Sequence, residues 1–124
     1  MPSSVQAGSE RSFDPQVARL IAKVKEHGNL SAAEIGEIVG VGTRQVQNWA
    51  SGNGRPASTK RLRQLLDLEY VLELIAEVFD DEGSTMWLHA RNRQLDGERP
   101  LDLISQNETE RVIGLLDRLA DGNF

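Results

Sequence analysis

The 124-residue sequence predicts an all-α fold in which two small helical halves are joined by one long helix. Apolar residues recur three and four positions apart through most of the chain, which is the spacing of one helix face. Ser, Asp or Pro precedes several of these apolar stretches and Gly follows them, as is typical of helix starts and ends. No stretch alternates β-branched and polar residues over the length of a strand, so we expect no sheet.

Two helices are predicted at the start of the first half. Asp14 is a good N-cap, and Pro15 suits the first position of a helix that ends near Gly28. Ser31 and Glu34 have the spacing of a capping box, in which each side chain accepts a hydrogen bond from the other residue's backbone N–H. These two residues therefore predict the start of a second helix.

A helix-turn-helix pattern follows from the glycine-containing turn at residues 40–42, where Val41 is placed to fill the space between two helices. In a short helix over residues 43–50, Val46 and Trp49 face inward. The side chains left facing outward suit base edges in the major groove of DNA: Thr43, Arg44, Gln45, Gln47 and Asn48. Three cations at the start of the next helix are expected to contact phosphates: Lys60, Arg61 and Arg63.

Residues 29–66 resemble the Xre/Cro-type helix-turn-helix family. Residues 30–41 are similar to its first two motif elements, and residues 46–52 to its recognition helix and exit. One departure is Gly42, where the family commonly has a Ser that caps the recognition helix. The resemblance implies binding to an operator DNA, and the alternative is a helical hairpin of the same shape without a DNA role.

Charge is divided unevenly along the chain, although the net charge is −5. Residues 1–66 carry nine Lys and Arg against five Asp and Glu, whereas residues 67–124 carry five against fourteen. A positive half suits a polyanionic partner, and the acidic half then needs a separate task. Chance is the alternative, because small domains often differ in charge.

The second half is predicted to begin on a long helix over residues 59–79, which bridges the two halves. Residues 80–83 break this helix, and the acidic residues among them are expected to form a solvated turn. A short helix holds Met86 to Leu88, and residues 92–100 are rich in turn formers. Most apolar side chains that follow the bridging helix are expected to be core: Trp87, Leu95, Leu101, Ile104, Val112 and Leu116.

The last helix is predicted to open at Asn107, with Glu110 three residues on, and to stop at Gly122. The sequence lacks several residue patterns that are typical of enzyme active sites. It has no cysteine, one histidine in each half (His27 near a helix C-terminus, and His89), no HExxH pair and no phosphate loop. We therefore expect neither catalysis nor a bound metal or cofactor.

Residues 1–12 predict a disordered leader, because they are rich in Ser and other polar residues and lack the basic and apolar regions of a signal peptide. No apolar run approaches the roughly 20 residues of a membrane-spanning helix. We expect a cytoplasmic protein without a membrane partner.

The second half resembles the C-terminal domain of the Xre/MbcA/ParS antitoxins over residues 68–124. The matching pattern is a Trp-Leu pair, an Asn, a Leu-x-Gly-x-x-Pro turn, a Leu-Ile run, and a last helix ending in a Gly and an aromatic. Departures are Arg91, where the family often has Pro, and Thr109, where it often has Gly. The resemblance implies an Xre/Cro-like helix-turn-helix bundle at 13–66 and a small toxin-binding domain at 67–124.

Such an antitoxin would hold a cognate RES-domain toxin, which degrades NAD or transfers its ADP-ribose, and would repress its own promoter as a homodimer within a higher-order complex. The alternative is a plain repressor whose second half only dimerises. Arg91, Arg93, Arg99 and Arg118 stand out as partner contacts, because Arg is enriched at interfaces. We expect Asp121–Phe124 to enter the toxin's cofactor site. The full set expected to bind the toxin is Arg91, Asn92, Arg93, Gly97, Arg118, Asp121, Gly122 and Phe124.

Overall fold

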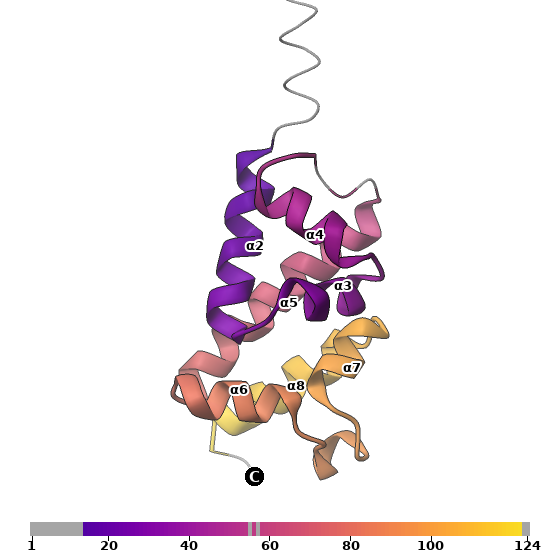
Figure 1. The fold of residues 1–124 in the computed structure, drawn as a ribbon. Coiled ribbons are helices and arrows are strands. Elements are labelled where there is room, and N and C mark those ends of the chain that lie inside the picture. Colours follow the sequence, from indigo (N-terminus) through magenta and orange to yellow (C-terminus); the bar gives the residue numbers. More distant parts are fainter. Residues whose placement is uncertain (1–13, 55, 57, 123–124) are drawn as a thin grey trace, which may run out of the picture.

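The computed structural model describes residues 14–54, 56 and 58–122, and these residues form helices and no strand (Figure 1). The all-α prediction is therefore confirmed for them, while the expected leader at 1–12 lies outside the described residues. The elements in chain order are α2 (Pro15–Gly28), α3 (Ala32–Val39), α4 (Thr43–Ala50), α5 (Thr59–Val78), α6 (Asp81–His89), the short 3₁₀ helix η1 (Arg93–Leu95), α7 (Pro100–Ser105) and α8 (Thr109–Ala120). No helix among the described residues is both long and apolar enough to cross a membrane.

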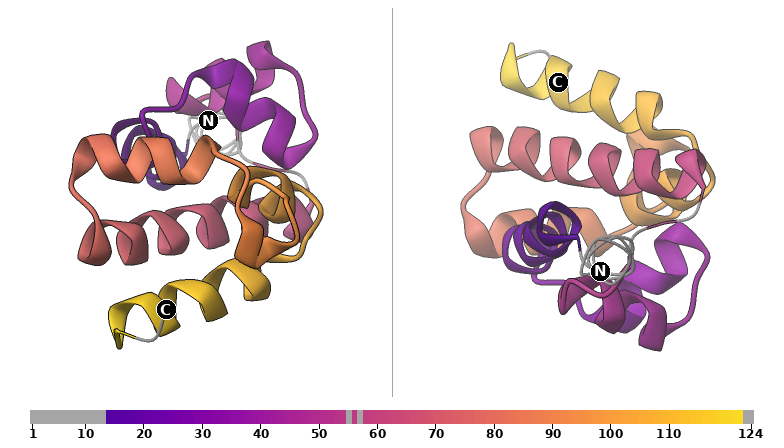
Figure 2. Two further views of the ribbon diagram at one scale, coloured as in Figure 1. Left: turned by 90° about the horizontal axis from the view of Figure 1, so that it is seen from below. Right: turned by 90° about the horizontal axis from the view of Figure 1, so that it is seen from above.

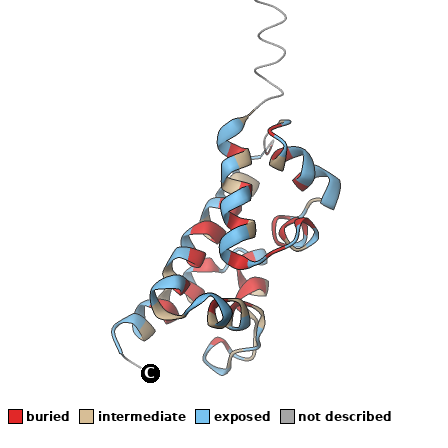
Figure 3. Cartoon of the chain, turned by 60° about the vertical axis from the view of Figure 1, so that its left-hand side comes forward, coloured by how far each residue is buried: buried red, intermediate tan, exposed pale blue. Residues whose placement is uncertain are grey.

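The long helix α5 runs through the middle of the molecule, with α2 and α6 on one side and α8 on the other (Figure 2). Buried apolar side chains from Val17 in α2 to Leu116 in α8 form one continuous core. Figure 3 shows these buried positions on the inward sides of the helices. The two halves expected from the sequence thus share a single core, and their separate tasks remain a prediction.

The predicted caps of α2 and α3 are confirmed. One carboxylate oxygen of Asp14 accepts hydrogen bonds from the backbone N–H groups of Gln16 and Val17, both at 3.1 Å. Ser31 and Glu34 form the complete capping box, with hydrogen bonds of 3.0 and 3.1 Å. These local bonds satisfy N–H groups that have no partner inside the helix.

Two expectations in the second half are wrong. The acidic residues after α5 are the start of α6, because Asp80 caps it by accepting a hydrogen bond of 2.8 Å from the backbone N–H of Gly83. Asn107 does not cap α8: it takes a left-handed conformation, with φ of 64°, and Glu108 is the N-cap without a side-chain bond. The turn-rich segment is followed by the short helix α7, which the sequence did not predict.

Polar contacts tie the first half to the second. The amide Nε2 of buried Gln64 donates hydrogen bonds to the carbonyl oxygens of Ile38 and Ser105, at 3.5 and 3.3 Å. The imidazole of His89 lies 3.0 Å from a carboxylate oxygen of Glu34, so α6 is joined to the capping box of α3. The hydrogen bond from the Ser31 backbone is the main cause that lowers the pKa of Glu34.

A second histidine also joins two helices. The Nδ1 atom of His27, at the end of α2, lies 3.1 Å from a carboxylate oxygen of Glu69 in α5. Glu69 is buried, and this burial raises its pKa although His27 opposes the shift. The sequence reading placed His27 near the α2 terminus but did not find its partner 42 residues away.

Candidate functional site

Helix α4, the predicted recognition helix, presents a polar surface to solvent. Val46 and Trp49 are buried on its inner side, as predicted. The structure brings all five predicted base-reading residues together on the exposed side of this one helix: Thr43, Arg44, Gln45, Gln47 and Asn48. Their exposure fits contact with a DNA groove, and their role in base reading stays a prediction.

The turn before α4 fixes how α3 and α4 meet. Gly40 has a φ of 78°, which favours glycine, and half-buried Val41 packs against the core as expected. The sequence reading missed Gly36, because its importance depends on a contact across the turn. A Cβ atom at Gly36 would lie 2.5 Å from the backbone oxygen of Val41, so only glycine lets the helices approach this closely.

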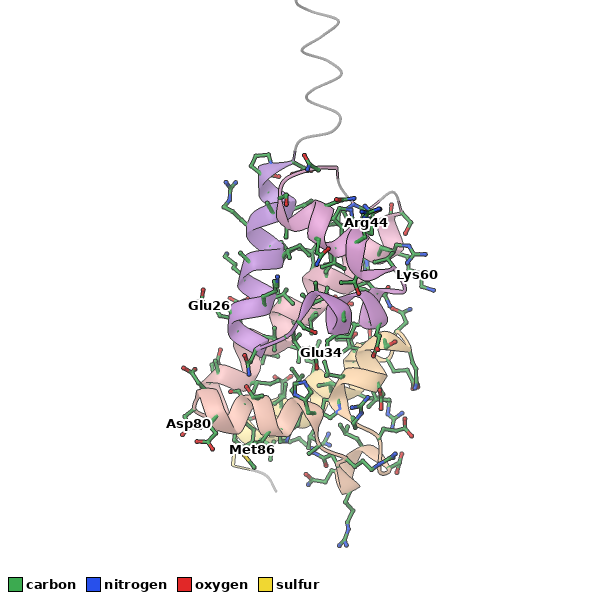
Figure 4. All side chains as sticks on the ribbon, viewed as in Figure 1. Glu26, Glu34, Arg44, Lys60, Asp80 and Met86 are labelled. Carbon is green, nitrogen blue, oxygen red and sulfur yellow. The ribbon has the colours of Figure 1, made fainter. Side chains whose placement is uncertain are left out.

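The predicted phosphate-contacting cations differ in their surroundings. The guanidinium of Arg61 donates hydrogen bonds to the carbonyl oxygens of Val39 and Gly40, at 2.6 and 2.5 Å, and thereby caps the C-terminus of α3. Arg61 therefore supports the turn, and any phosphate contact by it stays a prediction. Lys60 is exposed and has no ion pair with another described residue. Figure 4 shows Lys60 and Arg44 toward the same end of the molecule.

The turn over residues 91–98 is built by several residues that were expected to bind a partner. A side-chain oxygen of Asn92 accepts a hydrogen bond of 2.8 Å from the backbone of Gln94, and its backbone pairs with Glu98. Gly97 has a φ of 82°, and its carbonyl oxygen accepts a hydrogen bond of 3.2 Å from Arg91. Arg91, Asn92 and Gly97 thus hold the shape of this turn.

The arginines of the second half divide into paired and unpaired ones. Arg99 forms two hydrogen bonds with Asp102, at 2.9 and 2.8 Å, and these bonds are the main cause that lowers the pKa of Asp102. Arg111 pairs with Asp96 and Glu108. Arg93 and Arg118 are exposed, and neither has an ion pair among the residues that the structure describes.

Apolar side chains are exposed at the end of the molecule opposite α4. Met86 on α6 is 65% exposed, and Phe79 stacks at a tilt on Trp87 with ring centroids 6.0 Å apart. A shallow hollow of about 540 Å³ lies nearby between the ends of α5 and α8. We call this region the apolar end surface, made of Met86 together with the apolar residues that line the hollow: Val78, Phe79, Leu119 and Ala120. Sequence periodicity could not show which of these side chains stay exposed.

The end of α8 lies beside this surface. Asp121 and Gly122 are exposed, and Gly122 has a φ of 80°, so the chain leaves the helix there. Phe124, which was expected to enter a toxin pocket, lies outside the described residues. Within the described ranges, no three His, Asp or Glu side chains gather in a way that could hold a metal ion.

Comparison with known proteins identifies the family. Residues 74–122 match the sequence family described as the antitoxin Xre/MbcA/ParS C-terminal toxin-binding domain. The mycobacterial cidal antitoxin MbcA of Mycobacterium tuberculosis is 32% identical over 108 residues, which are 87% of this chain and 95% of the relative. The chain belongs to the Xre/MbcA/ParS family of antitoxins. This membership favours the antitoxin over the plain repressor, and it agrees with a binding protein that is not an enzyme.

Other relatives of this antitoxin are also described as antitoxins. A probable mycobacterial cidal antitoxin of M. tuberculosis is 31% identical and covers 88% of this chain and 91% of its own length. The crystal structure of the M. tuberculosis MbcT–MbcA toxin–antitoxin complex contains a chain with 31% identity and a TM-score of 0.76. That match covers 86% of this antitoxin and 96% of the other chain, so the whole fold is similar.

Proposed function

We propose that this antitoxin neutralises a RES-domain toxin by covering its active site and represses its own operon through α4. The observation that carries the proposal is the presence of two unlike exposed surfaces at opposite ends of one helical body (Figure 4). The polar side of α4 suits DNA, and the apolar end surface suits a protein. The solved complex of MbcA with the toxin MbcT supports a toxin partner, and the family resemblance supports the RES class.

The apolar end surface has the chemistry of a protein interface. Exposed Met86 and the hollow beside Phe79 offer apolar area that a partner can bury, and Met adapts to irregular surfaces. Exposed Arg93 and Arg118, which form no ion pair with another described residue, add cations from η1 and α8. Aromatic and Arg side chains are enriched among the residues that carry most binding energy at interfaces. All the residues of this surface, and both arginines, lie within residues 74–122, which match the toxin-binding domain.

Inhibition would come from the segment after α8. A site that binds NAD needs an apolar slot for a flat ring and cationic groups for the pyrophosphate. The ring of Phe124 suits the slot, and the carboxylate of Asp121 suits the cations. Gly122 has a left-handed backbone, with φ of 80°, so the helical conformation of α8 does not continue through it.

Deletion of residues 121–124 tests this mode of inhibition. The cognate toxin is purified with the full-length or the shortened antitoxin, and its NAD consumption is measured at equal occupancy. We expect the complex to survive, because most of the proposed contact surface remains, while part of the toxin's NAD consumption returns. Complete inhibition by the shortened antitoxin would contradict occlusion by this segment.

Two single variants test the role of α4 at the operator. Arg44→Ala should weaken binding to the antitoxin's own promoter by about 1–3 kcal/mol with little loss on unrelated DNA, because Arg44 would read a base. Lys60→Ala should weaken binding to both DNAs alike and reduce the salt dependence, because Lys60 would contact a phosphate. If neither variant changed the affinity for the promoter, the proposal would be contradicted.

A further inference from the structure

Side chains from two other helices hold the C-terminal end of α3. The last backbone bond of this helix runs from the N–H of Gly40 to the carbonyl oxygen of Gly36, so the carbonyl groups of residues 37–40 have no partner inside the helix. Each of these groups accepts a hydrogen bond from a side chain of α5 or α7. The donors are the Nη1 atom of Arg61 (to Val39 at 2.6 Å and Gly40 at 2.5 Å), the Nε2 atom of Gln64 (to Ile38 at 3.5 Å) and the hydroxyl of Ser105 (to Glu37 at 3.4 Å). We call Arg61, Gln64 and Ser105 the α3 cap residues.

The α3 cap residues join the two halves of the chain. Ser105 is the last residue of α7 and lies within the segment that matches the toxin-binding domain. Gln64 in α5 is 4% exposed, and its Nε2 atom also donates to the carbonyl oxygen of Ser105, at 3.3 Å. Helix α3 packs against both α4 and α7 and lies between them (Figure 1). A helix of the toxin-binding segment is therefore bonded directly to the end of the helix that precedes α4.

The start of α4 depends on this end of α3. Only Val41 and Gly42 lie between Gly40 and the first residue of α4, and Gly42 is an N-cap without a side-chain hydrogen bond. A Ser at that position would anchor the first turn of α4 locally. In its absence, the backbone that leaves α3 determines where α4 begins. Hydrogen bonds to base edges tolerate only small changes in distance and angle, so this placement matters for DNA.

We propose that the α3 cap residues position α4 for base reading. By holding the carbonyl groups before the turn, they set the direction in which the chain enters α4, and α7 thereby contributes to operator recognition without touching DNA. The inference rests on the proposed operator binding through α4. It gives Arg61 a role other than phosphate contact, because its Nη1 atom is directed at two carbonyl oxygens of the protein.

The affinity for the promoter relative to that for unrelated DNA tests the proposal. Gln64→Met keeps the length of the side chain but removes its N–H donors, and it should weaken binding of the full-length antitoxin to its own promoter roughly three- to ten-fold. Affinity for unrelated DNA, salt dependence and toxin inhibition should stay unchanged, because Gln64 is buried and uncharged. Lys60→Met is the control for a phosphate contact: Lys60 is exposed one turn earlier on α5, and its loss should weaken binding to both DNAs alike.

The other two α3 cap residues offer conservative pairs. Ser105→Ala removes the hydroxyl and should weaken promoter binding roughly two- to five-fold, whereas Ser105→Thr keeps the hydroxyl and should bind like the wild type. Arg61→Lys keeps the charge but loses the guanidinium, and it should weaken promoter binding roughly ten-fold with little loss on unrelated DNA. If Arg61→Lys bound the promoter as tightly as the wild type, charge alone would suffice and the positioning role of Arg61 would be overturned.

A spectroscopic measurement tests the positioning without DNA. The two tryptophans report on different helices, because Trp49 is buried on the inner side of α4 and Trp87 lies in α6. In Gln64→Met and Ser105→Ala, the indole N–H resonance of Trp49 in the proton NMR spectrum should shift, while that of Trp87 should stay in place.

An unmoved Trp49 resonance in both variants would overturn the proposal, as would equal losses of affinity for the promoter and for unrelated DNA. Promoter affinity that Gln64→Met and Ser105→Ala leave intact would also overturn it when Arg44→Ala does weaken promoter binding. If Arg44→Ala has no effect, the proposed operator binding fails instead, and the Trp49 resonance still decides whether the α3 cap residues position α4.

Discussion

Single residues decide how closely the helices of the first half can approach. Gly36 lies in the middle of α3, where glycine weakens a helix, yet a side chain there would meet the backbone oxygen of Val41. Gly114 in α8 is also helical, but the atom nearest to an added Cβ is the guanidinium nitrogen Nη1 of Arg118, at 3.9 Å. The same residue type thus serves a packing need at one position and none at the other.

We expect Gly36→Ala to lower the free energy of unfolding by about 1–3 kcal/mol, because the added methyl group forces the turn apart. Gly114→Ala should raise it by about 0.5–1 kcal/mol, because alanine loses less backbone entropy in a helix. Urea unfolding followed by circular dichroism measures both. Equal stability of the two variants would show that the α3–α4 turn is less tightly packed than described.

The lowered pKa of Glu34 predicts a pH dependence of stability. A carboxyl with a lower pKa in the folded state contributes stability above its unfolded value, about 4.5, and loses it as the pH falls through the folded value. Glu34→Gln keeps a capping-box residue but removes the charge that faces His89. The free energy of unfolding of this variant should therefore fall less than that of the wild type as the pH is lowered below about 4.5. A parallel decline in both proteins would contradict this role of Glu34.

At the scale of elements, the sequence predicted best the helices whose ends carry local side-chain caps. Asp14 and the Ser31–Glu34 pair bond to the backbone within three residues, so α2 and α3 could be located from neighbouring letters alone. Helix α7 was missed because it is short and its N-cap, Arg99, forms no side-chain capping bond. Asn107 was misread because Asn favours both N-caps and left-handed turns.

The candidate site was likewise predictable only where it depends on local sequence patterns. The exposed residues of α4 followed from the inward positions of Val46 and Trp49, which are local. The bonds from Arg61 to Val39 and Gly40 span more than twenty residues, and no short pattern encodes them. The exposure of Met86 depends in the same way on how α6 packs against the rest of the chain.

Substitution of Asn107 tests the corrected start of α8. Because its φ is 64°, Asn107→Gly should leave the free energy of unfolding unchanged or raise it, whereas Asn107→Ala should lower it by about 1 kcal/mol. An N-cap would behave differently, because Gly would then cost a few tenths of a kcal/mol. Thermal unfolding of both variants gives the comparison, and a loss of stability with Gly would restore the N-cap interpretation.

At the scale of the whole molecule, the two proposed tasks lie at opposite ends of a body with one core. The polar side of α4 is at one end and the apolar end surface at the other (Figure 4). Contacts such as those of Gln64 with Ile38 and Ser105 make the body between them continuous. A variant confined to exposed side chains of one surface, such as Arg44 or Met86, should therefore spare the other task, because these side chains lie outside the core.

The measurement that tests this account most directly follows operator binding and inhibition of the toxin's NAD consumption for the same two folded variants. We expect Arg44→Ala with Gln47→Ala to lose operator binding and inhibit the toxin fully. Met86→Asp with Arg93→Glu should bind the operator normally and inhibit poorly, because the changes fall on the apolar end surface and on an exposed cation of the segment that matches the toxin-binding domain. Loss of inhibition in the α4 variant, with its helix content intact, would contradict the assignment of the two tasks to two surfaces.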